Sequence, residues 1–324
     1  MKVVIIGGVA AGTKTAAKLK REHPMDDVAL YTKGSDISYA GCGLPYYVGG
    51  VIETREELVV NTPQKFTGLT GVEVRTNTEI TEIHPDGHTV RTAAGEEISY
   101  DKLVIAVGAE PFIPPVEGVN LPGVFTVRTP QDAVDIRSYA EENRCRQAVV
   151  VGGGFIGLEM AENLKKQGIT VTVVDMASQV MPNLLDPEVA DYVRRKLQKD
   201  GTRVMTGTAL KSLEGSLRVE AVHTSGGRIP ADLVILAVGI RPATGFLKDS
   251  GLEMFKGTIV TNACHETNLK DIYAVGDCAQ VHNRLTGRVS GPPWAPPPTL
   301  QAGTWPSIWQ VRERHIPAVW APAW

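Results

Sequence analysis

The feature that most constrains this chain is a glycine-rich turn near its middle, residues 152–157, with the sequence GGGFIG. It follows a buried-type apolar strand at 148–151 and precedes a helical pattern that ends at Gly168. The next strand runs over 169–174 and leads directly to an aspartate, Asp175. Strand, glycine turn, helix, strand and terminal acid are the signature of a dinucleotide-binding βαβ unit. The pattern therefore predicts an α/β fold with a parallel sheet.

This unit has the residue types that bind a dinucleotide. Its glycines let the backbone approach a pyrophosphate, which would lie at the N-terminus of the following helix. Asp175 can accept hydrogen bonds from both ribose hydroxyls but would repel a 2′-phosphate, and no arginine follows at 176–177. We therefore expect NADH in preference to NADPH; the alternative is a βαβ unit without nucleotide. The predicted contacts are Gly152, Gly154, Phe155, Ile156, Gly157 and Asp175.

A second, less regular copy of the pattern opens the chain. The apolar run 2–6 precedes the turn GGVAAG at 7–12, a helical pattern to about His23 and a strand at 28–31. The middle glycine is replaced by Val9, and the acid after the second strand by Thr32. Alone, this turn is equally compatible with a generic βαβ unit. The clean second copy favours the nucleotide-binding interpretation for both.

Later strands follow each unit and end alike. Residues 103–108 and 233–239 both close in Ala-Val-Gly, and residues 272–277 form a short strand that ends in Gly-Asp. The shared ending predicts two domains of common topology. In the last strand, glycine permits close backbone approach to a ligand, and Asp277 can bind a polyol hydroxyl.

These motifs, in this order, resemble the FAD- and NAD(P)H-dependent pyridine nucleotide-disulfide oxidoreductases. The segment SYAGCGLPY at 38–46 resembles their single-cysteine branch. That branch comprises coenzyme A-disulfide reductases, NADH oxidases, NADH peroxidases and persulfide reductases. The resemblance covers residues 1 to about 288.

The resemblance implies two Rossmann-like domains, with the NAD domain inserted into the FAD domain. FAD would lie on residues 1–112 and 245–288, and NADH on residues 113–244. Glu159 corresponds to the family glutamate near the nicotinamide, and Asp277 to the aspartate on the ribityl chain. Thr32 departs from the family acid at the adenosine ribose. The remaining predicted cofactor contacts are Gly7, Gly8, Val9, Ala10, Gly12, Lys33, Ala106, Gly108 and Gly239.

Cys42 is the candidate redox centre. Dithiol members of the family pair two cysteines five residues apart, and here the fifth residue after Cys42 is Tyr47. A lone cysteine can form a mixed disulfide with a small thiol or be oxidised to a sulfenate by peroxide. We expect electrons to pass from NADH through FAD to Cys42 and on to a small disulfide or persulfide, such as coenzyme A disulfide. NADH oxidase or peroxidase chemistry and a catalytically incompetent flavin-binding fragment are the alternatives.

The substrate is less constrained. Lys14, Lys18 and Arg21 share one face of the first predicted helix and match substrate-contacting positions of coenzyme A-disulfide reductases. They could hold the phosphates of coenzyme A, or form an ordinary solvated helix face. Ser38 and Gly41 are further substrate candidates, although Gly41 replaces an asparagine that the resemblance would place beside the substrate.

Composition limits the other classes of function. The chain has 324 residues, 43% of them hydrophobic, and a net charge of −3. This near-neutral balance predicts neither nucleic-acid nor membrane binding, and no Cys/His cluster has metal-ligand spacing. The opening residues lack a signal-peptide pattern, so we expect a cytoplasmic protein.

The last part of the sequence breaks the pattern. Residues 289–324 contain all five tryptophans and are rich in proline. Family members continue instead into a dimerisation domain that completes the active site of the neighbouring subunit, so the family implies a homodimer. We interpret the tail as a disordered segment or a frame-shifted reading; a proline-rich binding tail is the alternative.

Overall fold

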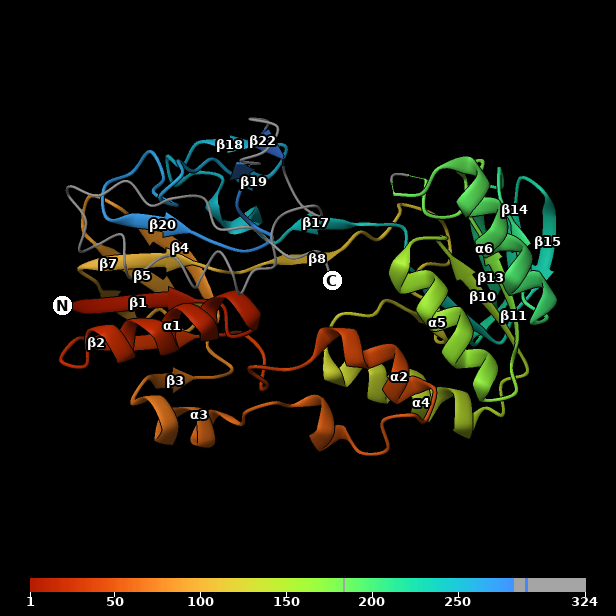
Figure 1. Ribbon diagram of the computed structural model, residues 1–324, viewed down its shortest axis with the longest axis horizontal. Coiled ribbons are helices and arrows are strands. Elements are labelled where there is room, and N and C mark those ends of the chain that lie inside the picture. Colours follow the sequence, from red (N-terminus) through yellow and green to blue (C-terminus); the bar gives the residue numbers. More distant parts are fainter. Residues whose placement is uncertain (183, 283–288, 291–324) are drawn as a thin grey trace. The chain divides into compact units, whose positions relative to one another are not determined.

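The computed structural model describes residues 1–182, 184–282 and 289–290 (Figure 1). Residues 291–324 of the atypical tail therefore lie outside the described part of the chain. Within the described part, no helix combines the length and the apolar composition needed to cross a bilayer. The helices and strands instead build two α/β units.

Backbone contacts divide the chain into two compact units, and the second is largely an insertion in the first. Strands β8 (Ala109–Pro111) and β17 (Ile240–Pro242) pair with each other. Each spans a point at which the chain passes from one unit to the other. The segment 40–58, which contains Cys42, groups with the second unit by backbone contacts, whereas the sequence analysis assigns it to the FAD domain. The first unit consists of residues 1–39, 59–110, 241–282 and 289–290, and the second of residues 40–58, 111–182 and 184–240.

A five-stranded parallel sheet forms the centre of the first unit, in the order β20-β7-β1-β2-β3. Strands covered on both faces read as continuous apolar runs, which explains the sequence VVII in β1. The elements of this unit are β1 (Lys2–Ile6), α1 (Ala10–Glu22), β2 (Asp27–Tyr31), α3 (Pro63–Thr70), β3 (Glu73–Arg75), β4 (Ile80–His84), β5 (Thr89–Thr92), β6 (Glu97–Ser99), β7 (Lys102–Ile105), β8 (Ala109–Pro111), β17 (Ile240–Pro242), η3 (Gly245–Leu247), β18 (Met254–Phe255), β19 (Thr258–Ile259), β20 (Ile272–Ala274), β21 (Val281–His282) and β22 (Val289–Ser290).

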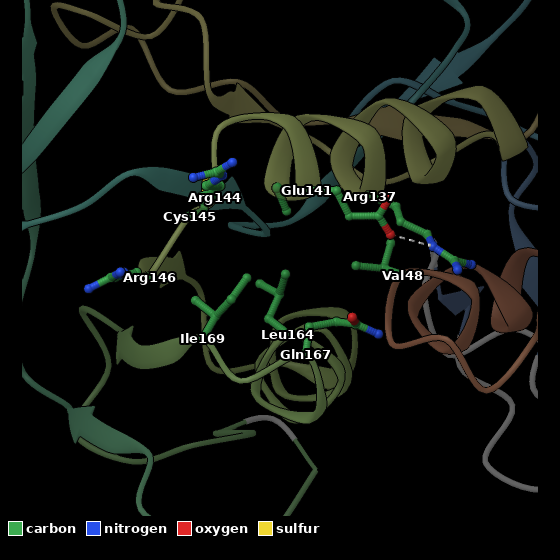
Figure 2. Close-up of a pocket in the computed structure, with 10 residues that line it drawn as sticks. Val48, Arg137, Glu141, Arg144, Cys145, Arg146, Leu164, Gln167 and Ile169 are labelled. Atoms are coloured by element: carbon green, nitrogen blue, oxygen red, sulfur yellow. Dashed lines mark hydrogen bonds and ion pairs between the residues drawn. The ribbon is translucent and has the colours of Figure 1, made fainter.

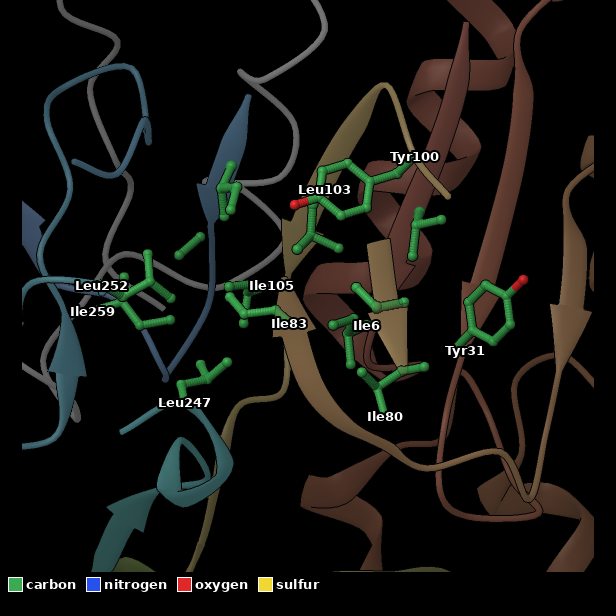
Figure 3. Packing of buried hydrophobic residues seen from close by; sticks show 14 of the residues in the cluster. Ile6, Tyr31, Ile80, Ile83, Tyr100, Leu103, Ile105, Leu247, Leu252 and Ile259 are labelled. Carbon is green, nitrogen blue, oxygen red and sulfur yellow. The ribbon is translucent and has the colours of Figure 1, made fainter. Parts of the chain in front are cut away.

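The two faces of this sheet are covered by different elements. Successive side chains of a strand point to opposite faces, so β1 contributes to two cores. Ile6 packs in a cluster with Ile83 of the antiparallel sheet β4-β5-β6 (Figure 3). Ile5 packs in another cluster with Leu19 of α1. Helix α1 therefore covers one face of the sheet, and in the chain it begins just after the carboxyl end of β1.

The second unit repeats this plan. Its parallel sheet has the order β12-β11-β10-β16-β9, and an antiparallel sheet β13-β14-β15 accompanies it. One cluster joins Val150 of β10 to α4 and α5, and another joins Val149 to the antiparallel sheet. Its elements are η1 (Gly41–Gly43), α2 (Leu44–Val48), η2 (Arg55–Leu58), β9 (Val124–Phe125), α4 (Pro130–Glu142), β10 (Gln147–Val151), α5 (Phe155–Lys166), β11 (Thr170–Val174), α6 (Pro187–Lys199), β12 (Arg203–Met205), β13 (Leu210–Gly215), β14 (Val219–Thr224), β15 (Gly227–Pro230) and β16 (Leu233–Leu236).

The repeated architecture confirms the predicted fold class. Each unit has a five-stranded parallel sheet with a glycine turn after its central strand, and each has a three-stranded antiparallel sheet. The strands that end in Ala-Val-Gly, β7 and β16, occupy equivalent positions beside β1 and β10. The protein is therefore built from two Rossmann-like halves, one inserted into the other.

Helix α4 begins with a complete capping box, which generates a stability prediction. The Thr129 hydroxyl accepts a hydrogen bond from the Asp132 amide at 3.2 Å, and the Asp132 carboxylate accepts one from the Thr129 amide at 2.8 Å. We expect Thr129→Ala to lower the free energy of unfolding by about 1 kcal/mol, because the Asp132 amide at the start of α4 loses its side-chain acceptor. Urea denaturation followed by far-UV circular dichroism measures this. Thr129→Ser keeps the hydroxyl and is the control; equal losses for both variants would contradict the prediction.

Candidate functional site

The two glycine turns have nearly the same backbone geometry. Gly7 has φ +112° and Gly152 has φ +113°, values that L side chains rarely adopt. A Cβ on either residue would lie 2.2 Å from a carbonyl oxygen of the neighbouring strand, that of Ala106 or Ala237. Only glycine fits such a close approach, so each turn is held against the strand that follows it in the sheet.

The third glycine of each turn packs just as tightly. A Cβ on Gly12 would lie 1.8 Å from the Gly7 carbonyl oxygen, and one on Gly157 would lie 1.9 Å from the Gly152 oxygen. The middle position differs, since a Cβ on Gly154 would meet nothing within 4 Å. The outer glycines are therefore required by the turn itself, whereas Gly154 leaves space at the start of α5.

The start of each turn's helix is uncapped by side chains. Neither α1, which begins after Val9, nor α5, which begins after Gly154, receives a side-chain hydrogen bond at its N-cap. The first amides of a helix have no intrahelical acceptor and favour anions. Ala10, Phe155 and Ile156 at these starts are exposed. Both helix N-termini thus have the properties of a pyrophosphate-binding site.

Asp175 lies at the carboxyl end of β11, beside the second turn. One of its carboxylate oxygens accepts a hydrogen bond from the Gly153 amide at 2.5 Å, and the other accepts one from the Ala177 amide at 2.7 Å. These bonds hold the carboxylate at the edge of the turn, and each oxygen keeps a lone pair for a ligand. The Asp175 carboxylate therefore lies beside the second glycine turn with acceptor capacity left for a ligand.

Thr32 takes the corresponding place in the first unit. Thr32 follows β2, and a Cβ placed on Gly8 would lie 3.1 Å from the Cβ of Thr32. It is half-buried, and Lys33 next to it is exposed. The carbonyl of Gly8 accepts a hydrogen bond from the Ser38 amide at 2.9 Å. The chain therefore returns to the first turn shortly before it reaches Cys42.

The other predicted cofactor contacts lie at the carboxyl ends of strands. Gly108 (φ +67°) follows β7, and Asp277 follows β20, which pairs with β7 in parallel. Carboxyl ends of parallel strands meet at one edge of a sheet, so Ala106, Gly108 and Asp277 share the edge that holds the first turn. Gly239 (φ +122°) follows β16 in the same way in the second unit.

Glu159 lies one turn into α5 and is half-buried. Burial, followed by the nearby Glu162 carboxylate, raises the pKa of its carboxyl above the usual value. Glu159 thus lies after the second glycine turn, near the start of α5, in a half-buried position.

Cys42 occupies an exposed turn between two glycines. The 3-10 turn η1 is closed by a hydrogen bond from the Gly43 amide to the Ala40 carbonyl at 2.8 Å. Cys42, in the middle of this turn, is exposed. A Cβ on Gly41 would meet nothing within 4 Å. The local backbone therefore leaves the thiol open to a bulky partner.

The other three cysteines are less accessible. Cys145 and Cys278 are buried, and Cys264 is intermediate. Burial raises the pKa of Cys145 to about 11, and that of Cys278 likewise to about 11. Buried neutral thiols of this kind are packing residues rather than nucleophiles.

The three predicted substrate cations lie on α1 but differ in their surroundings. Lys14 and Arg21 are exposed, whereas Lys18 is half-buried and forms an ion pair with Glu22 at 3.4 Å. Ser38 has φ +49°, and its hydroxyl accepts a hydrogen bond from the Asn61 amide at 3.4 Å. An anion at this helix face would therefore compete with Glu22 for Lys18.

A separate cavity lies at the amino end of the second unit's sheet (Figure 2). Its volume is about 300 Å³, and it contains none of the predicted site residues. Arg137 on α4 lines it, and its Nε is 3.1 Å from the Glu141 carboxylate (Figure 2). The sequence analysis missed Arg137, because nothing in a helix pattern shows which distant segment a surface arginine contacts.

Taken together, two glycine turns with the same geometry and one acidic residue beside the second define a fold of two dinucleotide-type units, and one exposed cysteine lies in the second unit. Comparison with known proteins agrees. The family model described as "Pyridine nucleotide-disulphide oxidoreductase" matches residues 1–299, and this chain belongs to that family.

Three similar proteins illustrate the relationship. The NAD(P)H sulfur oxidoreductase (CoA-dependent) of Pyrococcus abyssi is 40% identical over 319 residues, which cover 98% of this chain and 71% of that protein. The NADH oxidase of Methanocaldococcus jannaschii is 39% identical, over 89% of this chain and 65% of that protein. The solved structure of a NAD-dependent persulfide reductase from A. fulgidus superposes with a TM-score of 0.93 at 34% identity, covering 98% of this chain and 61% of that one. This chain thus spans about two thirds of the length of these relatives.

The cysteine environments predict selective alkylation. At pH 8 a thiol with a pKa of about 11 is ionised in about one molecule in a thousand, and Cys145 and Cys278 are also buried. We expect iodoacetamide to label Cys42 at least about a hundredfold faster than either, as measured by mass spectrometry of tryptic peptides. Unfolding in urea should make all three rates similar. Equal rates in the folded protein would contradict the assigned environments.

Proposed function

We propose that this protein uses FAD and NADH to reduce a small-molecule disulfide or persulfide at Cys42. The observation that carries the proposal is an exposed cysteine in a glycine-flanked turn, within a chain that contains two dinucleotide-type glycine turns. The names of the relatives, which include a CoA-dependent sulfur oxidoreductase and a persulfide reductase, support the same chemistry.

Cys42 acts on an external substrate in this proposal. All four cysteines, Cys42 among them, are free in the structure, so the proposal gives Cys42 a partner from outside the chain. The Cys42 thiolate attacks one sulfur of a disulfide RSSR, forms a mixed disulfide and releases RS⁻. Two electrons from NADH then cleave the mixed disulfide and regenerate the Cys42 thiolate with a second RS⁻. The sum is NADH + H⁺ + RSSR → NAD⁺ + 2 RSH.

The first unit is the proposed FAD-binding domain. Its fit to FAD rests on the uncapped N-terminus of α1 and on the glycine turn closed by Gly7 and Gly12. Val9, Thr32 and Asp277 lie on the same edge of the sheet as that turn. When bound, FAD supplies the two-electron transfer between nicotinamide and sulfur. The protein's own residues orient the cofactor and hold Cys42 in an exposed turn.

The second unit is the proposed NADH-binding domain. The open space at Gly154 and the uncapped start of α5 fit a pyrophosphate. The Asp175 carboxylate, fixed by two backbone amides, can accept hydrogen bonds from ribose hydroxyls and repels a 2′-phosphate. Glu159, whose pKa is raised, is the proposed residue near the nicotinamide.

Coenzyme A disulfide and related persulfides are the substrates we favour. Lys14 and Arg21 are exposed on α1 and available to phosphate groups. Lys18 can also contact a phosphate when its ion pair with Glu22 breaks. NADH oxidase activity through a Cys42 sulfenate is the second candidate, favoured by the name of the Methanocaldococcus relative. The homodimer expected from the family stays a prediction, since the chain spans only part of the length of its relatives.

Gly154 and Gly157 of the second turn should respond differently to substitution. Gly157→Ala places a Cβ 1.9 Å from a backbone oxygen, so we expect a lower melting temperature. Gly154→Ala meets no protein atom, so the melting temperature should stay unchanged while NADH binding weakens about tenfold or more. Thermal unfolding and titration calorimetry with NADH measure the two effects. Unchanged NADH affinity in Gly154→Ala would argue against this location of the pyrophosphate.

Substitution of the cysteine tests its role, and comparison of electron acceptors separates the candidate activities. We expect Cys42→Ser to lower NADH oxidation with coenzyme A disulfide or peroxide by at least about a hundredfold, because serine cannot form the mixed disulfide or the sulfenate. Bleaching of the flavin by NADH should persist. Turnover with oxygen or peroxide but not with disulfide in the unsubstituted protein would favour the oxidase or peroxidase alternative. Flavin bleaching without any thiol-dependent turnover would indicate a catalytically incompetent fragment.

A further inference from the structure

The segment that carries Cys42 cannot hold its shape alone. Helix α2 has only five residues, and isolated helices of that length are unstable in water. The segment 40–58 therefore depends on contacts with the rest of the second unit. We propose that Arg137 on α4 is a positioning residue for Cys42, holding this segment in place; the proposal rests on the function proposed above.

Arg137 makes three kinds of contact with its surroundings. One terminal nitrogen, Nη1, donates to the carbonyl of Tyr47 at 3.4 Å and to that of Glu53 at 3.3 Å. The guanidinium carbon lies 5.0 Å from the centre of the Tyr47 ring, a cation–π distance. A different nitrogen, Nε, pairs with Glu141. One side chain thus joins α4 to the end of α2 and to the loop that follows.

These contacts add to the apolar packing of the segment. Leu44 and Val48 bury one side of α2 in the core that α4 and α5 share, but the loop after α2 has polar backbone groups and glycines. At Gly49 a Cβ would lie 2.3 Å from the Asn163 side chain, so α2 and α5 touch there. Arg137 adds a link from α4 to the carbonyls of Tyr47 and Glu53, and the Tyr47 carbonyl also accepts a hydrogen bond from the Gly50 amide at 3.1 Å.

The turn of Cys42 is connected to α2 without a flexible linker. Residue Leu44 both caps η1 and begins α2, so the two helices form one continuous unit. A Cβ on Gly43 would lie 3.1 Å from the side chains of Ile52 and Leu58. The Ala40 amide also bonds the Leu58 carbonyl at 2.8 Å. A shift of α2 or of the loop after it therefore moves Cys42 as well.

The geometry explains why arginine suits this position. The guanidinium presents several donors in a rigid plane, so Nε can pair with Glu141 while Nη1 reaches both carbonyls. A lysine ammonium could reach one acceptor group but could not make all these contacts at once. The Arg137 side chain is only 28% exposed, which limits competition from water.

Hydrogen exchange tests the contact in the full 324-residue chain without any cofactor. The amides of Gly49, Gly50, Val51 and Ile52 are bonded to carbonyls of residues 45–47 and report on this segment. We expect Arg137→Ala to speed their exchange about tenfold, with Arg137→Lys intermediate. The matched control is Arg144→Ala, an exposed arginine of the same cavity whose side chain forms no hydrogen bond or ion pair with residues 40–58. Unchanged exchange in Arg137→Ala would overturn the proposal.

Turnover of the FAD-loaded protein distinguishes positioning from simple support. We expect Arg137→Ala to lower kcat with coenzyme A disulfide at least about tenfold, because misplacement of a reacting atom is costly. The KM for NADH and the rate of flavin bleaching should stay unchanged, and Arg137→Lys should restore part of kcat. Faster exchange with unchanged kcat would overturn the positioning role. Absence of turnover in the unsubstituted protein would overturn the proposed function, and exchange alone would then decide if Arg137 holds the segment.

Discussion

The structure depends on the close approach of a glycine turn to the next strand of its sheet. In both units the first glycine lies against a carbonyl of the adjacent strand, so closely that a Cβ would be 2.2 Å from the oxygen. That approach requires positive φ and the absence of a side chain. It also directs the following helix so that its free amides lie at the carboxyl edge of the sheet. Everything assigned to nucleotide binding follows from this placement.

The same constraint acts twice, and the differences between the copies carry the specific information. Asp175 holds its carboxylate beside the second turn by two backbone amides, whereas Thr32 stands at the corresponding position of the first. An acid at one turn and a hydroxyl at the other produce different electrostatic environments for a ribose. In the proposed function, Asp175 suits the ribose of NADH in the second unit, whereas Thr32 departs from the acid that the family implies at the adenosine ribose of FAD in the first.

The sequence was informative about elements that depend on local pattern. Apolar runs predicted the central strands, and the glycines predicted both turns, because a buried parallel strand and a tight turn each have a composition of their own. The three cations of α1 were predicted to share a face, but the ion pair between Lys18 and Glu22 was not. The grouping of segment 40–58 with the second unit was also not predicted. The sequence of its short helix does not indicate which other elements it packs against.

By itself, the sequence determined the α/β class, the duplication and the candidacy of Cys42, since spacing alone excludes an internal dithiol partner five residues on. Only the tertiary structure decided which cysteines are buried, with Cys145 and Cys278 inside and Cys42 exposed. It also decided that Arg137 contacts the segment of Cys42, across about ninety positions of sequence. Local patterns fix how a chain turns, but burial and distant contacts depend on how the elements pack together.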